Sequence, residues 1–181
     1  MSRKAVIRGI GHGVPERVLT NAEISEMVDT SDEWIVQRTG IRERRICNDN
    51  ESTSSLSITA AREALADAKV DPETLDLVVV GTVTGDFIFP STSCLVQSSI
   101  GAVNAGAYDV GAACAGFIYS LSTAAGMIES GRANRALVIG VDTLTKVVDW
   151  TDRSTCVLFG DGAGAVVLEA DENSDRGVMQ T

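Results

Sequence analysis

The sequence predicts an α/β fold with a mostly parallel sheet, helices on both of its faces and a buried central helix. Three observations favour this fold. Fully apolar runs of strand length at 77–81 and 136–141 suit a sheet that is covered on both sides. Segments with helical apolar periodicity alternate with these runs along the chain. Hydrophobic residues make up 44% of the 181 residues and charged residues 22%, which is typical of a folded globular protein.

Residues 1–71 are expected to form one strand and three helices. The strand lies near 5–10 and is closed by glycines. Two short helices over 21–28 and 31–37 each begin at a residue of N-cap type. A longer amphipathic helix over 52–68 ends before Asp71-Pro72.

The rest of the chain adds, beside the two apolar strands, a helix over 91–100, a short strand over 107–110 and a long helix over 113–130. A final strand pair is expected over 156–159 and 163–170. The long helix is apolar on nearly all sides, which is typical of a buried central helix. Gly131 is its expected C-terminal stop.

Length and composition exclude several classes of protein. The chain, 1–181, has the length of one domain, although apolar character resumes over 176–181 as if the chain were cut there. The apolar runs are far shorter than the ~20 residues of a membrane span, so no membrane insertion is expected. The start shows no secretory signal, and the four cysteines have no metal-like spacing. We therefore expect a cytoplasmic protein with reduced cysteines and no metal.

The charge balance argues against a nucleic-acid partner. The net charge is −10, whereas a nucleic-acid binder needs a basic surface. One cluster of basic side chains is present, and it consists of Arg38, Arg42, Arg44 and Arg45. That cluster is compatible with a small phosphorylated ligand and equally with a solvated charged loop.

Cys114 is the candidate nucleophile. It follows a strand and a turn of small residues, and it is expected in the first turn of the long helix. The positive end of a helix favours a thiolate, and small neighbours let a substrate approach the sulfur. The alternative is a buried cysteine that acts as a small hydrophobe. A nucleophilic thiol usually needs a base, and His12, the single histidine, lies in a turn where it is more often incidental.

Three motifs resemble one known family. Residues 29–44 (DTSDEWIVQRTGIRER) are similar to the signature of β-ketoacyl-acyl-carrier-protein synthase III, a condensing enzyme of type II fatty acid synthesis. Residues 112–117 (AACAGF) resemble its nucleophile motif, and residues 159–165 (FGDGAGA) its glycine-rich turn. The resemblance implies a thiolase-like fold of two similar halves, of which this chain is the N-terminal one. The active-site His and Asn of the family lie in the other half.

The resemblance also implies a reaction. Cys114 would take the acyl group of an acyl-CoA, and decarboxylative condensation with malonyl-acyl-carrier-protein would give a β-ketoacyl-carrier-protein. Acyl-CoA is then a substrate, and no cofactor is implied. The 181-residue chain alone is expected to be inactive, because the base and the second oxyanion donor lie in the other half.

The family match also assigns binding residues. It places the adenine of CoA between Trp34 and Arg153, next to Thr30, and the nucleotide and phosphates near Arg38 and Thr39. An indole face and a guanidinium plane both suit stacking on a base. Ser154 departs from the family, because some relatives have glycine after the arginine.

In the family, the position of Phe89 reaches across a homodimer interface and closes the partner subunit's acyl pocket. A bulky ring there implies a short acyl-CoA such as acetyl-CoA. From the residues alone, Phe89 and its aromatic neighbour read as hydrophobic loop anchors.

Two other classes of function remain open. One is a non-catalytic subunit that uses the fold only to bind CoA or a partner. The other is a related thiolase-fold enzyme: a thiolase, a hydroxymethylglutaryl-CoA synthase or a secondary-metabolite acyltransferase. The motif around Cys114 and the presence of Trp34 argue against the non-catalytic subunit. The 29–44 signature argues against true thiolases and leaves the secondary-metabolite enzymes open.

Overall fold

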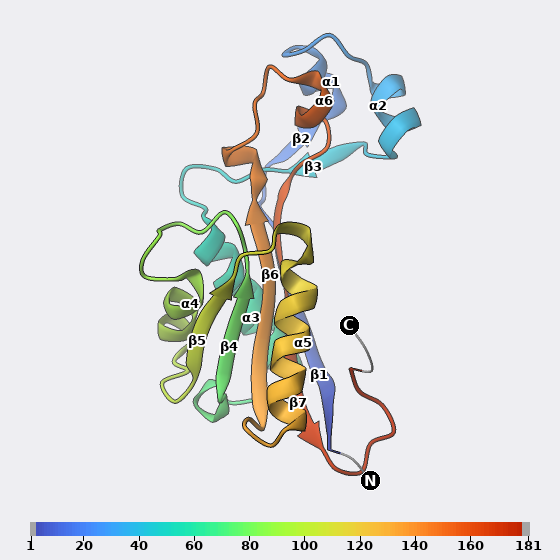
Figure 1. Cartoon of the computed structure of the whole chain (residues 1–181). Coiled ribbons are helices and arrows are strands. Elements are labelled where there is room, and N and C mark those ends of the chain that lie inside the picture. The colour runs from blue at the N-terminus through green and yellow to red at the C-terminus, as the bar shows by residue number, and fades with distance from the viewer. Residues whose placement is uncertain (1–2, 179–181) are drawn as a thin grey trace. The chain divides into compact units, whose positions relative to one another are not determined.

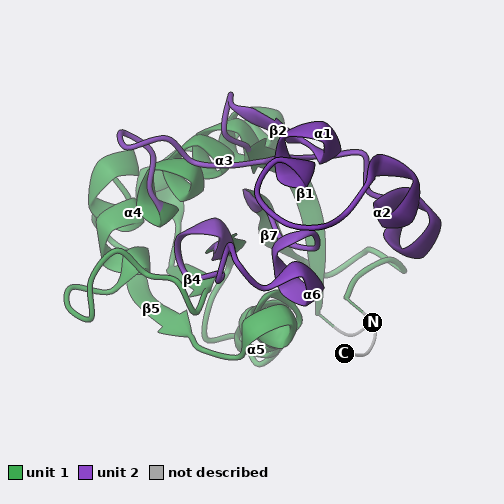
Figure 2. Ribbon diagram, turned by 90° about the horizontal axis from the view of Figure 1, so that it is seen from above, with its two compact units in different colours: residues 1–13, 53–142, 163–181 green, residues 14–52, 143–162 purple. Residues whose placement is uncertain are grey.

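The computed structural model describes residues 3–178. Two compact units make up the chain (Figure 2). The first, here called the sheet unit, comprises residues 1–13, 53–142 and 163–181. The second, the small unit, comprises residues 14–52 and 143–162. The strands and helices alternate as predicted, so the α/β class is confirmed.

The sheet unit is built on a five-stranded sheet in the order β1-β7-β6-β4-β5. The strands are β1 (Lys4–Gly13), β4 (Leu77–Gly81), β5 (Gly106–Val110), β6 (Arg135–Thr143) and β7 (Asp161–Asp171). β4 is parallel to both β5 and β6, whereas β1 is antiparallel to β7. All five residues of β4 are buried, as expected of a strand that is covered on both faces.

Helices cover both faces of this sheet. α3 (Thr53–Ala68) and α4 (Thr92–Ile100) lie on one face, and α5 (Gly116–Glu129) lies on the other (Figures 1 and 2). Buried alanines of α3 allow close packing on β1. Apolar side chains between α5 and the sheet form a core that includes Val79, Ala124, Ile128, Val138 and Leu168. The 3₁₀ turn η1 (Pro72–Thr74) joins α3 to β4.

α5 differs from the predicted buried helix in two ways. The first difference is its start, which is Gly116 rather than residue 113. Its end agrees with the prediction, since the helix stops at Glu129 and Gly131 has a left-handed conformation. The second difference is its burial. Only one side of it is buried, because Ile118 and Tyr119 are 44% and 55% exposed. The expectation of burial on all sides was therefore wrong for this chain.

The small unit holds a short antiparallel ribbon and three short helices. The ribbon pairs β2 (Val18–Thr20) with β3 (Glu43–Arg45). The helices are α1 (Asn21–Ser25), α2 (Asp32–Thr39) and α6 (Arg153–Cys156), and a 3₁₀ turn η3 covers Leu144–Lys146. Their apolar side chains form a separate core that includes Leu19, Ile24, Ile35, Cys156 and Val157. The predicted N-cap Ser31 of α2 is confirmed, because its side chain accepts from Trp34 N. The cap of α1 is Thr20, one residue before the predicted start, and its side chain accepts from Glu23 N.

The predicted strand over 156–159 was wrong. Residues 153–156 form α6, whose first turn is capped by the Asp152 carboxylate through Ser154 N at 2.9 Å. The apolar run was misleading because Cys156 and Val157 are buried in the core of the small unit rather than in a sheet. The final strand is the single long β7.

No helix within residues 3–178 has the length and apolar character that crossing a membrane requires. Residues 179–181 belong to the segment on which the expectation of a cut chain was based. They lie outside the described residues, so that expectation stays a prediction.

Candidate functional site

Cys114 lies in the 3₁₀ turn η2 (Ala113–Ala115), between β5 and α5, and is exposed. Its place differs from the predicted first turn of the helix, because α5 starts two residues later. Ala113 directly before it has φ 47°, a left-handed conformation that non-glycine residues rarely adopt. Such strain is often retained at functional sites, where surrounding structure holds the backbone in place.

The backbone contact between Gly81 and Gly116 fixes the turn that carries Cys114. A Cβ atom added to Gly81 would come within 2.5 Å of the carbonyl carbon of Gly116, so only glycine permits this approach of β4 and α5. The N-cap residue Ala115 makes no side-chain cap to α5. The Gly116 N–H donates to the Ala113 carbonyl within the turn. The positive end of the α5 dipole beside Cys114 favours negative charge there.

The single histidine does not serve as a partner of Cys114 in this chain. His12 Nδ1 lies 2.8 Å from Glu63 Oε2, and its backbone N donates to the same oxygen at 2.6 Å. His12 and Glu63 are both well exposed. The predicted turn was wrong, because His12 lies in β1 opposite Gly164 of β7. Its pairing with Glu63 agrees with the interpretation of this histidine as incidental.

The other cysteines are in environments that differ from that of Cys114. Burial, together with the neighbouring Asp161 carboxylate, raises the pKa of the Cys47 thiol to about 12. Burial also raises the pKa of Cys156, which is 1% exposed. The Cys94 sulfur accepts a hydrogen bond from Ser91 Oγ at 3.1 Å. A raised pKa leaves Cys47 and Cys156 as unreactive thiols at neutral pH.

The small unit brings together three of the predicted CoA-binding residues. The Arg38 guanidinium carbon lies 4.8 Å from the centroid of the Trp34 ring, and that of Arg153 lies 4.1 Å from it. Trp34 and Arg38 are one helical turn apart on α2, whereas Arg153 begins α6. The structure therefore forms a cation–π stack from two segments that are far apart in the sequence.

Two other predicted binding residues use their side chains differently. The Thr30 hydroxyl is buried and has no hydrogen-bond partner among residues 3–178. The Thr39 hydroxyl donates to the Ile35 carbonyl at 2.7 Å and accepts from Ile41 N at 3.0 Å, so it closes the end of α2. The site roles of Thr30 and Thr39 stay predictions.

The basic cluster of residues 38–45 does not form one ligand surface. Arg44 is only 7% exposed and donates to Asn21 Oδ1 at 2.8 Å and to the Val157 carbonyl at 2.9 Å. Burial lowers its pKa. Arg44 thus holds the small unit together, which the sequence pattern did not indicate.

Ser154, the departure from the family pattern, has a local structural role. Its backbone N and its Oγ both donate to Asp152 Oδ1, at 2.9 and 2.7 Å. These bonds lower the pKa of Asp152 and keep it charged at the start of α6. The serine therefore supports the turn that presents Arg153.

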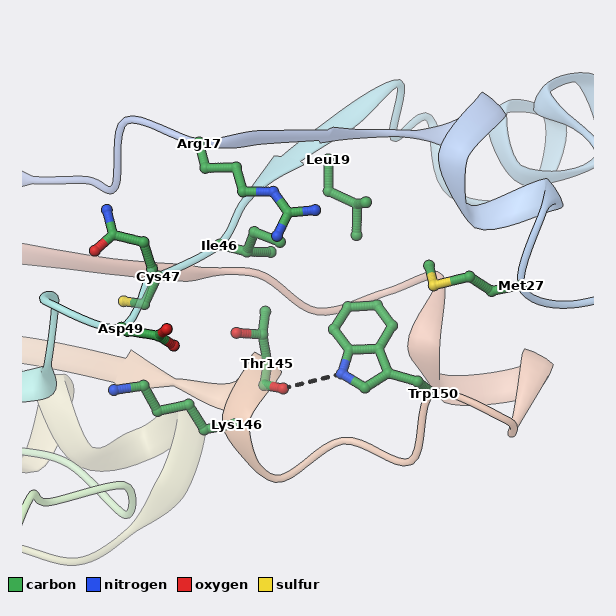
Figure 3. A pocket seen from close by; sticks show the side chains of 10 residues that line it. Arg17, Leu19, Met27, Ile46, Cys47, Asp49, Thr145, Lys146 and Trp150 are labelled. Atoms are coloured by element: carbon green, nitrogen blue, oxygen red, sulfur yellow. Dashed lines mark hydrogen bonds between the residues drawn. The ribbon is translucent and has the colours of Figure 1, made fainter.

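The small unit also contains a pocket of about 450 Å³ that the sequence did not indicate (Figure 3). Its walls carry the cations Arg17 and Lys146, the Asp49 carboxylate and the Trp150 ring, whose Nε1 donates to the Thr145 carbonyl at 3.2 Å. None of the predicted site residues lines it. Because its lining comes from separate segments of the chain, no motif could have revealed it. Within residues 3–178, no group of three His, Cys, Asp or Glu side chains is placed to hold a metal ion.

Comparisons with known proteins agree with the motifs. A family model described as 3-oxoacyl-[acyl-carrier-protein (ACP)] synthase III matches residues 108–181. The chain is 58% identical over 177 residues to a β-ketoacyl-[acyl-carrier-protein] synthase III of Xylella fastidiosa (strain Temecula1), covering 98% of this chain and 54% of that protein. The chain thus spans about half the length of the curated relatives it matches.

Solved structures give the same result for the fold. A 3-oxoacyl-[acyl-carrier-protein] synthase III from Aquifex aeolicus VF5 matches with a TM-score of 0.91 and 51% identity, over 93% of this chain and 55% of that one. The priming β-ketosynthase of the R1128 polyketide pathway matches with a TM-score of 0.92 and 43% identity, over 94% and 51%. The resemblance to the synthase III family and its thiolase-like fold is confirmed.

Proposed function

We propose that this chain is the N-terminal half of a β-ketoacyl-[acyl-carrier-protein] synthase III, an acyltransferase that begins type II fatty acid synthesis. The observation that carries the proposal is Cys114. It is an exposed thiol on a strained turn at the N-terminal end of α5, in a chain 58% identical to a protein of that name.

In the first step, the Cys114 thiolate attacks the carbonyl carbon of an acyl-CoA. The carbonyl π electrons move to the oxygen, and the bond from carbon to the CoA sulfur then breaks. CoA leaves as a thiolate, and the acyl group remains on Cys114 as a thioester. The positive N-terminal end of α5 beside Cys114 favours the transient negative charge.

In the second step, malonyl-acyl-carrier-protein loses CO₂, and the electron pair of the broken bond becomes a carbanion. That carbanion attacks the thioester carbon, and the Cys114 sulfur leaves as a thiolate. The product is a β-ketoacyl-acyl-carrier-protein. The family resemblance assigns the base and the second oxyanion donor to the half of the protein that is not in this chain.

The same proposal includes the binding partners. CoA binds with its adenine between Trp34 and Arg153, and Arg38 contributes positive charge for the phosphates. The complete protein acts in the cytoplasm as a homodimer, in which Phe89 reaches the partner subunit's acyl pocket. Phe89 is 88% exposed in this chain, which supports a surface role.

A second candidate function is priming of a secondary-metabolite pathway. It is favoured by one observation, the TM-score of 0.92 and 43% identity to the R1128 priming β-ketosynthase. The two candidates share the Cys114 chemistry and differ in the carrier protein that receives the product.

Radiolabelled acetyl-CoA tests the proposal in the complete protein that contains this chain. We expect one labelled cysteine, loss of the label in Cys114→Ala and retention of CoA affinity. Cys94→Ala is the matched control and should keep the label. Label that persists in Cys114→Ala would refute the assignment, and CoA binding without any label would favour the non-catalytic subunit. Product formed only on a carrier protein from outside fatty acid synthesis would favour the second candidate.

A further inference from the structure

The loop between β4 and α4 carries an apolar tip that points into solvent. Its residues Phe87, Ile88 and Phe89 are 62%, 105% and 88% exposed. Three consecutive exposed apolar residues would normally collapse onto the protein surface, because burial of apolar area is favourable. The polar contacts on either side of the tip show what holds it out.

The first part of the loop is bound to β6. Asp142 Oδ1 accepts hydrogen bonds from Thr82 Oγ1 at 3.1 Å, Val83 N at 2.9 Å and Thr84 Oγ1 at 2.9 Å. One carboxylate oxygen thus fixes three consecutive residues as they leave the sheet. Bonds to an ionised acceptor are stronger than neutral ones.

The middle of the loop is bound to the N-terminus of α3. The Asp86 carboxylate accepts from Thr53 N at 2.9 Å and Ser54 N at 3.1 Å. Thr53 Oγ1 donates in return to the Thr84 carbonyl at 2.5 Å. The loop is therefore fixed up to the residue that precedes Phe87.

The last part of the loop is bound to β5 through Asp109. Its carboxylate accepts from Thr92 N and Ser93 N, both at 2.8 Å and both in buried residues at the start of α4. The N-cap residue Ser91 makes no side-chain cap of its own, and its hydroxyl instead bonds Ser93 Oγ and the Cys94 sulfur. A distant strand thus supplies the cap that local sequence usually provides.

We propose that Asp109 is a positioning residue for acyl-chain selectivity, because it fixes the end of the loop that carries Phe89 to the strand that leads into the turn of the nucleophile. Asp109 lies on β5 five residues before Cys114. β5 therefore connects directly both to the turn that carries the thiol and to the end of the loop whose ring limits chain length. The inference rests on the proposed function, in which Phe89 closes the partner subunit's acyl pocket.

The test compares Asp109→Asn with Asp76→Asn in the complete protein. Asp76 is a matched control, since its carboxylate also accepts from two consecutive backbone N–H groups, those of Asn134 and Arg135 at 2.6 and 3.0 Å. The readouts are the ratio of kcat/KM for octanoyl-CoA to that for acetyl-CoA, and hydrogen exchange of the backbone amides of residues 87–93 other than Pro90, which has no N–H.

In Asp109→Asn we expect the ratio to rise roughly tenfold and the amides of 87–93 to exchange faster, because the charge-assisted cap is lost. Asp76→Asn should leave both readouts as in the wild type. An unchanged ratio despite faster exchange would overturn the proposal. An equal rise of the ratio in both variants would also overturn it, because the effect would then be general destabilisation.

The double variant Ser91→Asp/Asp109→Asn keeps the test decisive if Asp109→Asn does not fold. It supplies a carboxylate at the N-cap itself, so the ratio should return toward the wild-type value. A folded double variant whose ratio stays high would contradict the capping role of Asp109. A wild-type protein that forms no β-ketoacyl product from any acyl-CoA would instead refute the proposed function, so the two failures are distinguishable.

Discussion

The Arg153 guanidinium carbon lies 4.1 Å from the centroid of the Trp34 ring, and the two groups are stacked in direct contact. A purine between them would need a separation of about 7 Å, which is twice the contact distance of roughly 3.5 Å between carbon atoms. Arg153 thus stands where the proposed adenine would bind. Binding of the adenine therefore requires the Arg153 guanidinium to move away from the Trp34 ring by one ring thickness. The cation–π contact between Arg153 and Trp34 is then replaced by two stacking contacts of the purine, one with each side chain.

Trp34→Ala should weaken CoA binding to the complete protein by ~1–3 kcal/mol, the range for stacking of a base on an aromatic side chain. Titration calorimetry with CoA and with 4′-phosphopantetheine measures the effect. The loss should be confined to CoA, because only CoA carries the adenine.

Two variants serve as comparisons for Trp34→Ala. Arg153→Lys keeps the charge and removes the planar group, so it should also weaken CoA more than 4′-phosphopantetheine. Trp150→Phe changes the other tryptophan of the small unit and should leave both affinities unchanged. An unaltered dissociation constant in Trp34→Ala would make Trp34 a packing residue only.

Local sequence signals predicted those parts of the fold that depend on contacts between residues near one another in the sequence. The N-cap Ser31 and the helix stop at Gly131 act through residues at most a few positions away, and both are confirmed. The apolar strands were equally clear, because a strand covered on both faces leaves no polar position.

The missed features depend on distant contacts. β2 and β3 have only three residues each, too few for a clear strand pattern. Arg44 in β3 is buried, and its guanidinium donates to groups as distant in the sequence as the Val157 carbonyl. No local pattern marks such an arginine as internal. The Arg153–Trp34 stack could be anticipated only through the family resemblance, since the two residues lie on separate segments.

Alkylation should distinguish the cysteines. At pH 8 we expect iodoacetamide to modify Cys114 first, because it is exposed, whereas burial raises the pKa of Cys47 to about 12. Only the thiolate reacts, and a raised pKa means that the thiolate forms at higher pH. Alkylation of Cys47 should therefore stay slow across the neutral and mildly alkaline range. Peptide mass spectrometry of samples taken over time measures the alkylation rates of Cys114 and Cys47. Equal rates for Cys47 and Cys114 at pH 8 would contradict the assigned environments.

Gly11→Ala should destabilise the sheet unit. A Cβ atom at Gly11 would overlap the carbonyl oxygen of Ala60 on α3, where neither backbone can shift freely. Overpacking of this kind typically costs about 1–3 kcal/mol. Gly164→Ala on the neighbouring strand is the control, because nothing lies within 4 Å of its Cβ position. Urea unfolding of both variants gives the free energies, and equal values would show that α3 is not packed as described.

Phe89→Thr should raise activity of the complete protein with C8–C12 acyl-CoA relative to acetyl-CoA. The reason is that a pocket closed by a phenyl ring excludes longer chains, and modest excess volume costs about 1–3 kcal/mol. Ile88→Thr is a suitable control, since it removes an equally exposed apolar group beside Phe89. Wild-type protein that already uses dodecanoyl-CoA as well as acetyl-CoA would refute the pocket argument.

The 181-residue chain alone should not form a β-ketoacyl product. Its single histidine, His12, is paired with Glu63 rather than with Cys114, so the chain supplies no imidazole base for the thiol. It also exposes Ile118 and Tyr119 on α5. An exposed apolar surface of this kind favours association and lowers the concentration of active monomer.

The measurement is product formation from acetyl-CoA and malonyl-acyl-carrier-protein by the purified chain, with the complete protein as the positive control. The Cys114→Ala form of the chain gives the background, because any true turnover must pass through that thiol. Product from the chain above this background would show that residues 1–181 contain all the catalytic groups. The division of the catalytic machinery between two halves would then be wrong, and the base would have to be sought among the carboxylates of the sheet unit.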